Sequence, residues 1–172
     1  MEPKIVPVAT GEVLDFSEWA AVIKVAAEAT DGTLTVIETR HDPGEGASTH
    51  IHSRESETFL VMDGRVTFQV GDARYEVEPG GIVFGPPGTA HGFEVGADGG
   101  RLLHLFAPSG MEGYFRDMHA AEAAGINVDY VKIRQQYGVQ TTNPPLGQRQ
   151  PSARTDSAPQ TEPADGHLVQ EP

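Results

Sequence analysis

The stretch GEGASTHIHSRESETFLVMDG, residues 44–64, decides the fold of this chain, because it spaces potential metal ligands along a strand pattern. It contains His50-x-His52 and, after four further residues, Glu57. A later stretch, GGIVFGPPGTAH, ends in a fourth candidate, His91. Imidazole and carboxylate groups together suit divalent metals such as iron, manganese, nickel, cobalt, copper or zinc. The sequence therefore predicts one divalent transition-metal ion held by these three histidines and one glutamate.

The spacing of the ligands also predicts a bend in the backbone. Residues i and i+2 of a strand share one face, so His50 and His52 point the same way, about 6.6 Å apart at Cα. Glu57 is at an odd offset from His52 and would face the opposite side of an unbroken strand. We therefore expect the polar residues 53–56 to form a bend that brings Glu57 back toward the ion. Glu55 is an alternative ligand, but the bend favours Glu57.

Short apolar stretches separated by turn residues follow one another along the middle of the chain. Asp31-Gly32 is a strong hairpin signal, and further Gly and Pro residues interrupt the pattern roughly every 8–12 residues. The expected strands are residues 22–29, 34–40, 58–62, 65–70, 74–77, 82–84, 91–95 and 102–106. Regularly spaced short strands of this kind indicate an all-β sandwich or barrel.

Helical periodicity replaces the strand pattern in the last third of the chain. Met111 and Met118 recur at helical spacing, which predicts a helix with Ser109 as its cap and Gly125 as its stop. The two methionines should form the face that packs on the barrel. A second helix is expected at residues 128–137.

Composition changes again from residue 143 onward. Residues 143–172 are rich in Pro, Gln, Ser, Thr and Ala, with almost no large apolar residue. Such a segment cannot bury enough surface to offset its ordering entropy, so we expect a disordered tail. The chain then divides into an N-terminal arm (1–19), a β-barrel (20–108), helices packed on the barrel (109–142) and the tail (143–172).

Composition also excludes several classes of protein. The 172 residues contain no cysteine, which rules out disulfides, thiolate metal sites and cysteine nucleophiles. The formal net charge of −13 repels phosphate backbones and anionic membranes, so neither a nucleic acid nor a membrane partner is expected. The N-terminus has no signal-peptide pattern, and the apolar stretch 19–29 is too short to span a bilayer. A cytoplasmic protein is the default expectation.

The two ligand stretches resemble the two signature motifs of the cupin superfamily. The matching positions are Gly44, His50, His52, Glu57 and Gly64, followed by Gly80, Pro86, Gly88 and His91. Only the last motif position departs, where Val95 replaces the usual Asn, and this affects turn packing rather than the ligands. The layout of residues 20–146 is similar to that of single-domain quercetin dioxygenase-like cupins. The resemblance implies a cupin-type double-stranded β-helix (jelly-roll) barrel with one or two C-terminal helices.

The same resemblance implies a quercetinase-like oxygenase, in which O2 adds to a small enol or phenol at the metal and Glu57 is the catalytic base. The expected substrate is a small organic molecule, apolar or aromatic. Two alternatives stay open: a metal-dependent isomerase, cyclase or decarboxylase of a small carbonyl compound, and a non-catalytic cupin that binds a small ligand. A degenerate site without metal also stays open. A homodimer is expected, because open β-edges need cover and related cupins pair.

Strand parity assigns further side chains to the substrate pocket. Phe59 and Val61 share a face with Glu57, and Phe93 shares one with His91, so all three are expected to line the cavity. The other histidines have less distinctive positions.

His104 alternates with Leu102 and Phe106 along a strand, which leaves two interpretations. It reaches the pocket, where it supports a metal ligand or contacts the substrate, or it is an ordinary strand histidine without a chemical role. The remaining histidines are expected to be solvated: His41 in a loop, His119 on a helix and His167 in the tail. None of these three is expected to take part in the site.

Overall fold

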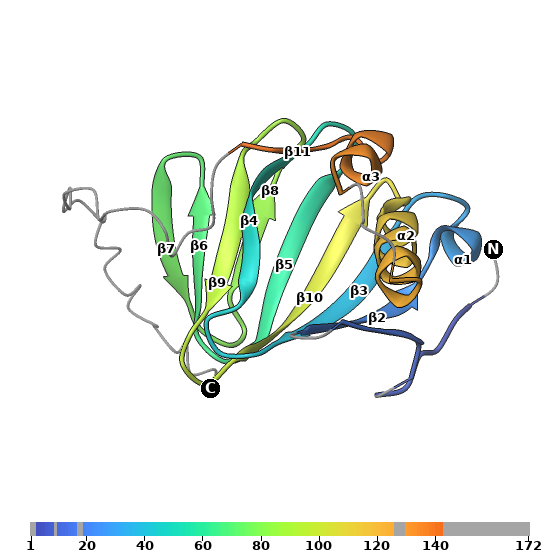
Figure 1. The fold of residues 1–172 in the computed structure, drawn as a ribbon. Coiled ribbons are helices and arrows are strands. Elements are labelled where there is room, and N and C mark those ends of the chain that lie inside the picture. Colours follow the sequence, from blue (N-terminus) through green and yellow to red (C-terminus); the bar gives the residue numbers. More distant parts are fainter. Residues whose placement is uncertain (1–2, 9, 17–18, 126–129, 143–172) are drawn as a thin grey trace, which may run out of the picture.

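The computed structural model describes residues 3–8, 10–16, 19–125 and 130–142, which form two antiparallel β-sheets that face each other (Figure 1). One sheet contains, in spatial order, β1 (Glu12–Asp15), β2 (Trp19–Val25), β3 (Thr35–His41), β10 (Gly100–Ala107), β5 (Ser56–Asp63) and β8 (Ile82–Gly85). The other contains β11 (Val139–Thr141), β4 (Gly46–His52), β9 (His91–Val95), β6 (Val66–Val70) and β7 (Ala73–Val77). The chain passes repeatedly between the sheets, which is the arrangement of a jelly-roll barrel.

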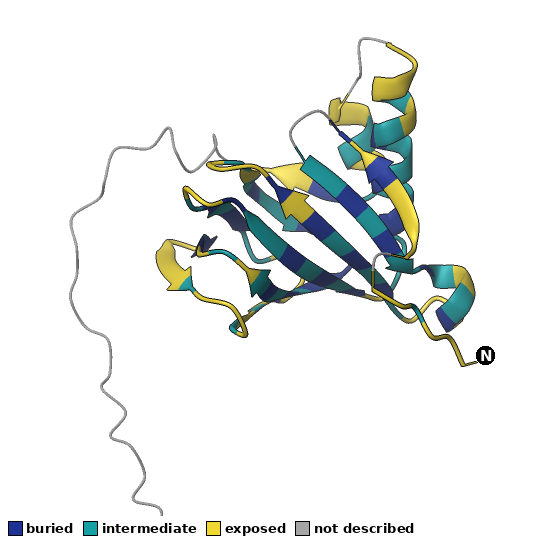
Figure 2. Cartoon of the chain, turned by 90° about the horizontal axis from the view of Figure 1, so that it is seen from below, coloured by how far each residue is buried: buried dark blue, intermediate teal, exposed yellow. Residues whose placement is uncertain are grey.

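Alternating side chains bury the inner face of each sheet. In β5, Glu57, Phe59 and Val61 are buried, whereas the residues between them are half-buried. Figure 2 shows this alternation as bands of buried and less buried residues along the strands. A pleated strand places every second residue on one face, so each strand contributes one row to the interior.

Two glycines permit close approaches that a side chain would block. At Gly64, φ is 76°, and an added Cβ would lie 2.2 Å from the carbonyl oxygen of Gly99. At Gly46, an added Cβ would lie 2.0 Å from the carbonyl oxygen of Phe93. The second contact lies between β4 and β9, so these two ligand-bearing strands pair closely only because residue 46 has no side chain.

The interior contains two hydrophobic clusters. One is packed between the sheets and consists of Phe59, Val61, Val66, Phe68, Phe93, Val95 and Leu102. The other includes residues of the strands and of the long helix: Ile37, Phe106, Met111, Phe115 and Met118. The ring of His91 contacts Phe59, and the ring of His52 contacts Phe106, so the predicted ligands lie where the two clusters meet.

The helices lie on one side of the barrel (Figure 1). Helix α2 (Met111–Ala123) packs against β1 and β3, and α3 (Tyr130–Gln136) packs against α2 and β11. As the periodicity predicts, Met111 and Met118 are buried. The remaining helix, α1 (Ala27–Thr30), is a single turn. In the described part of the chain, no helix combines the length and the apolar character needed to cross a membrane.

The structure confirms the all-β jelly-roll prediction and corrects several boundaries. The expected strand 22–29 ends at Val25, because α1 intervenes before the Asp31-Gly32 turn, where both residues have positive φ. The expected Ser109 cap of α2 is wrong, because the Glu112 carboxylate accepts the Gly110 N–H at 3.0 Å instead.

Two strands were not predicted. β1 lies inside the segment 1–19 that was expected to be an arm, and it pairs with β2. β11 follows the last helix and pairs with β4. The residues expected to open the second helix, 128 and 129, and the tail 143–172 lie outside the described residues.

Candidate metal centre

Three strands bring the four predicted ligands to one point. His50 and His52 lie on β4, Glu57 is the first buried residue of β5, and His91 is the first residue of β9. β4 and β9 are neighbours in one sheet, with His50 directly opposite His91. β5 belongs to the other sheet, and residues 53–55 form the bend between β4 and β5 that the spacing predicts.

The ligand atoms are close enough to share one ion. All four lie within 4.8 Å of one another. Glu57 Oε2 is 3.0 Å from Nε2 of both His52 and His91 and 3.9 Å from His50 Nε2. The Nε2 atoms of His50 and His52 are 3.1 Å apart. An ion about 2.1 Å from each ligand would separate neighbouring ligand atoms by about 3.0–3.4 Å, so the four groups fit a transition-metal ion.

Backbone carbonyls fix the orientation of two of the rings. His50 Nδ1 is 2.7 Å from the Ser48 carbonyl oxygen, and His91 Nδ1 is 2.9 Å from the Thr89 carbonyl oxygen. A carbonyl oxygen only accepts hydrogen bonds, so each Nδ1 donates its proton and Nε2 is the ring nitrogen that faces the centre, where it would bind a metal ion once it has lost its own proton. Histidines that bind metals are held in this way.

The electrostatics of the cluster favour a bound cation. Burial opposes ionisation of Glu57, but hydrogen bonds from the surrounding histidines outweigh it and hold the pKa of this carboxyl well below its usual range. Burial lowers the pKa of His50. At His91 burial acts in the same direction, but the Glu57 carboxylate outweighs it and raises the pKa. A buried carboxylate among imidazole nitrogens needs a positive charge beside it, and a divalent ion supplies one.

Glu55, the alternative ligand, is buried but does not join the cluster. Its Oε2 is 3.9 Å from His52 Nδ1, the ring nitrogen that does not face the other ligands. Neither of these two atoms has a hydrogen-bond partner among the described residues. Burial raises the pKa of Glu55. Glu55 therefore lies behind His52, and Glu57 supplies the carboxylate of the ligand set.

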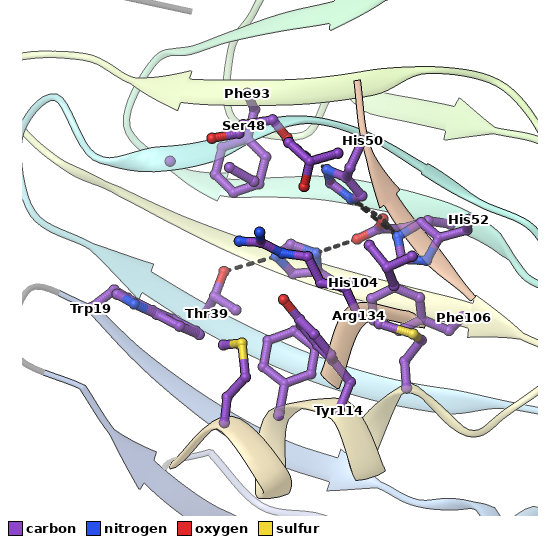
Figure 3. Close-up of a pocket in the computed structure, with 18 of the residues that line it drawn as sticks. Trp19, Thr39, Ser48, His50, His52, Phe93, His104, Phe106, Tyr114 and Arg134 are labelled. Atoms are coloured by element: carbon purple, nitrogen blue, oxygen red, sulfur yellow. Dashed lines mark hydrogen bonds and ion pairs between the residues drawn. The ribbon is translucent and has the colours of Figure 1, made fainter. Parts of the chain in front are cut away.

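His104 connects the cluster to a buried hydrogen-bond chain (Figure 3). Its Nδ1 is 2.8 Å from Glu57 Oε1, and its Nε2 is 2.8 Å from the Thr39 hydroxyl. The same hydroxyl is 3.0 Å from His41 Nε2. Because the ionised carboxylate only accepts, His104 donates to Glu57, accepts the Thr39 proton, and leaves Thr39 to accept from His41. The chain holds Glu57 Oε1 in place and leaves Oε2 facing the three ligand histidines.

A cavity of about 290 Å³ opens beside the cluster. The polar residues of the centre that line it are His50, His52, Glu57 and His104. The helices contribute Met111, Tyr114, Phe115, Met118, Glu122, Tyr130 and Arg134. The His50 side chain is 15% exposed, whereas those of the other three ligands are at most 4% exposed. A small molecule in the cavity would therefore approach an ion from the His50 side.

The residues expected in the substrate pocket divide into two groups. Phe93 and His104 line the cavity. Phe59 and Val61 do not, and the expectation for them is corrected: they are 1% and 0% exposed and belong to the cluster packed between the sheets. Parity places them on the inner face of β5, but the strand carries them past the cavity into the core.

His41 requires a second correction. It was expected to be solvated in a loop, but it is the last residue of β3, is 7% exposed and lines the cavity. The signal was present in the sequence, because residues 35, 37, 39 and 41 form one buried row of that strand. His119 is half-buried on α2, with its ring edge against Phe16, and His167 lies outside the described residues.

Sequence reasoning also missed several other cavity residues, among them Trp19, Tyr114 and Arg134, which come from β2, α2 and α3. Helical periodicity identifies which face of α2 is buried. It gives no signal for which residues of two helices reach over a cavity that the strands form.

Comparisons with known proteins agree with this geometry. Residues 38–106 match the family model described as Cupin domain. Quercetin 2,3-dioxygenase of Bacillus subtilis (strain 168) is 24% identical over 96 residues, which are 56% of this chain and 28% of that enzyme. The similarity thus spans less than a third of the enzyme.

Solved structures share the fold. KdgF from Halomonas sp. has a TM-score of 0.59 at 17% identity, with 65% of this chain and 99% of that chain covered. An RmlC-like cupin from Shewanella frigidimarina NCIMB 400 has a TM-score of 0.57 at 20% identity, with 65% and 96% covered. At these identities the likeness establishes the fold alone.

Proposed function

We propose that the protein is a metal-dependent oxygenase of the quercetinase-like type, starting from the match of residues 38–106 to the family model described as Cupin domain. Its substrate would be a small enol or phenol to which O2 adds. The observation that carries the proposal is the set of four ligand atoms within 4.8 Å of one another, beside a cavity of about 290 Å³. The similarity to quercetin 2,3-dioxygenase supports the same class of reaction.

The ligand set suits this chemistry. A divalent ion bound by His50, His52, Glu57 and His91 would supply Lewis acidity toward an enol or phenol oxygen and a redox centre for reaction with O2. Glu57 would take the proton that the enol or phenol loses, with Oε2 as the accepting oxygen, because His104 Nδ1–H occupies Oε1. His50 and His91 would keep their ligand nitrogens aimed by donating Nδ1–H to backbone carbonyls.

The cavity would orient an aromatic substrate and exclude water. Phe93 and Phe106 are buried on its walls, and Trp19 and Phe115 add further aromatic surface. A volume of about 290 Å³ is at the small end of ligand pockets, which span roughly 300–1,000 Å³. The substrate would therefore be a small molecule with an apolar ring and an ionisable oxygen.

Oxygen uptake tests the proposal. Purified protein is loaded with each candidate divalent metal and offered flavonols, phenols and 1,3-diketones in an oxygen electrode. We expect one O2 consumed per substrate and both atoms of labelled O2 in the product, since such a reaction needs no added reductant. His91→Ala protein is the matched negative control. Absence of oxygen uptake with every pair of metal and substrate would contradict the proposal.

The buried chain from Glu57 through His104 and Thr39 to His41 favours a second candidate function. Hydrogen-bonded imidazole and hydroxyl groups move protons. Isomerising or cyclising a small carbonyl compound requires proton transfer, and decarboxylation requires a proton for the carbon that has lost CO2. Turnover under anaerobic conditions would identify this alternative, because the oxygenase requires O2.

We also propose that the protein forms a homodimer. β8 is an edge strand, and its Ile82 and Phe84 are 67% and 57% exposed. An unpaired, apolar strand edge is stabilised by pairing with another chain. Light scattering should give twice the mass of the chain for the wild type and a smaller mass for Phe84→Glu. A wild-type monomer would exclude this assembly.

A further inference from the structure

Arg134 places a positive charge at the cavity from α3, whereas the four candidate metal ligands lie on strands. Its side chain extends from α3 into the cavity, as Figure 3 shows. Its Cζ lies over the Tyr130 ring, 5.9 Å from the ring centre, which is a cation–π distance. Among the described residues that line the cavity, Arg134 is the single Lys or Arg.

No ion pair joins Arg134 to a carboxylate within the described residues. Glu122 is the carboxylate that lines the cavity from the helices, and its Oε1 accepts the Tyr130 hydroxyl proton at 2.9 Å. By contrast, Arg116 on α2 forms a bidentate pair with Glu12, with a shortest distance of 2.7 Å. In a chain with 25 acidic and 12 basic residues, an arginine that faces a cavity without a carboxylate partner is available to a ligand.

Tyr114 adds a neutral donor beside this charge. The two side chains are neighbours on the cavity surface (Figure 3). Burial raises the pKa of the Tyr114 phenol, and the guanidinium offsets only part of that rise. The phenol therefore keeps its proton at neutral pH and can donate it to an anion held by Arg134.

The cavity thus carries polar groups on two sets of elements. The ligand cluster lies on the strands, and Arg134, Tyr114 and Glu122 lie on the helices. A guanidinium presents a planar fork that matches a carboxylate, and one guanidinium balances one negative charge. A phosphate dianion would need more donors than this single cation.

We propose that the substrate is an aromatic or enolic monocarboxylate whose carboxylate pairs with Arg134 while its enol or phenol oxygen faces the His50, His52, Glu57 and His91 cluster. The inference rests on the proposed function for the reacting oxygen, but the carboxylate preference is a binding property that exists without turnover. Arg134 is then a specificity residue, because it selects the acid over an equally shaped neutral molecule.

A matched pair of probes tests the inference. 4-Hydroxybenzoate and 4-hydroxybenzamide have nearly the same shape and differ by one charge at neutral pH. Calorimetric titration gives their dissociation constants for metal-free and metal-loaded protein. Emission from Trp19, the single tryptophan of the chain and a cavity residue, reports whether the probe occupies the cavity. We expect the acid to bind at least about tenfold more tightly than the amide, because charge-assisted hydrogen bonds are strong.

Variants separate the role of Arg134 from general charge effects. Arg134→Gln should reduce binding of the acid to the level of the amide and leave the amide unchanged, whereas Arg134→Lys should keep part of the preference. Arg116→Gln removes the same charge from α2 outside the cavity and should keep the full preference. Thermal unfolding of each variant checks that the helices remain packed.

The outcomes distinguish this inference from the oxygenase proposal. Equal binding of acid and amide to the wild type, or an unchanged preference in Arg134→Gln, would overturn it even if the protein consumes O2. A preference for the acid that depends on Arg134 supports the carboxylate inference. It does so even if no substrate gives oxygen uptake, because absence of uptake counts against the oxygenase proposal alone.

Discussion

Replacing His104 with phenylalanine tests how the outer hydrogen bonds support the metal centre. The new ring is close in shape to imidazole and keeps its packing against Phe59, whose ring centroid is 5.0 Å away. The change removes the 2.8 Å contact to Glu57 Oε1 and the 2.8 Å contact to the Thr39 hydroxyl. The Glu57 side chain is 4% exposed, so water cannot replace the lost donor without rearrangement of the core.

The expected loss follows from the charge on Glu57. A hydrogen bond to a charged group contributes about 1.5–3 kcal/mol, and about 1.4 kcal/mol corresponds to a factor of ten in affinity. We therefore expect His104→Phe to weaken metal binding about 10–100-fold, which is the usual effect of removing a partner of a metal ligand. Thr39→Val removes a neutral hydrogen bond, worth about 0.5–1.5 kcal/mol, and should weaken binding by less than about tenfold.

Competition with a chelator of known affinity measures the metal dissociation constant for each variant. His104→Gln keeps an N–H donor and should recover part of the affinity lost in His104→Phe. His119→Phe alters a histidine of α2 outside the hydrogen-bond chain and should bind metal like the wild type. If His104→Phe stays within about twofold of the wild type, Glu57 does not depend on His104 for its orientation, and the reasoning is refuted.

Three further predictions concern the centre, the core and pH. His50→Ala or His91→Ala removes one of the four ligand atoms and should weaken metal binding by at least about 100-fold, more than the loss of a partner of a ligand, while His119→Ala binds metal like the wild type; wild-type affinity of either variant in the chelator competition would refute the ligand assignment. Val61→Ala should lower the free energy of unfolding by about 2–3 kcal/mol without changing metal content, because Val61 is packed in the core; a smaller loss would contradict this placement. Burial lowers the pKa of His41 from 6.5 to about 3, so below pH 6.5 the unfolded chain binds a proton that the folded chain does not. As the pH falls from 6.5 toward about 3, the free energy of unfolding should therefore decrease by up to about 1.4 kcal/mol per pH unit. Urea titrations of His41→Gln at several pH values should lack this dependence on pH.

The strands and the ligand positions could be predicted because both follow from local rules. Alternation along a strand fixes which residues share a face, and the odd offset between His52 and Glu57 requires the bend that the structure contains at residues 53–55. Turn residues mark the strand ends, as at Asp31-Gly32. These features depend on neighbouring residues in the chain, so the sequence alone is sufficient to predict them.

The walls of the cavity could not be predicted in the same way. Alternation along a strand shows which side chains point into the barrel, but it does not show whether an inward side chain lines the cavity or packs in the core below it. Phe59 and Phe93 both point inward, but one is packed in the core and the other lines the cavity. His41 was not predicted to line the cavity, because the expected strand ended at residue 40 and β3 ends at His41. That one residue excluded His41 from the row of buried side chains at positions 35, 37, 39 and 41. Arg134 lies on a helix that follows the barrel in the chain, and its position depends on how α3 packs against α2 and β11.

The acidity of the chain and the inferred carboxylate substrate are compatible because they act over different distances. The net charge of −13 repels extended polyanions, which meet the field of the whole surface. Solvent and salt screen that field over about 8 Å, whereas a molecule inside the cavity experiences the groups that line it. A divalent ion with one carboxylate ligand would carry about one net positive charge, and of the two charged helix residues that line the cavity, Arg134 offsets Glu122. With an ion bound, the cavity would therefore be a positive region within an acidic domain, and it would favour a small anion over large polyanions.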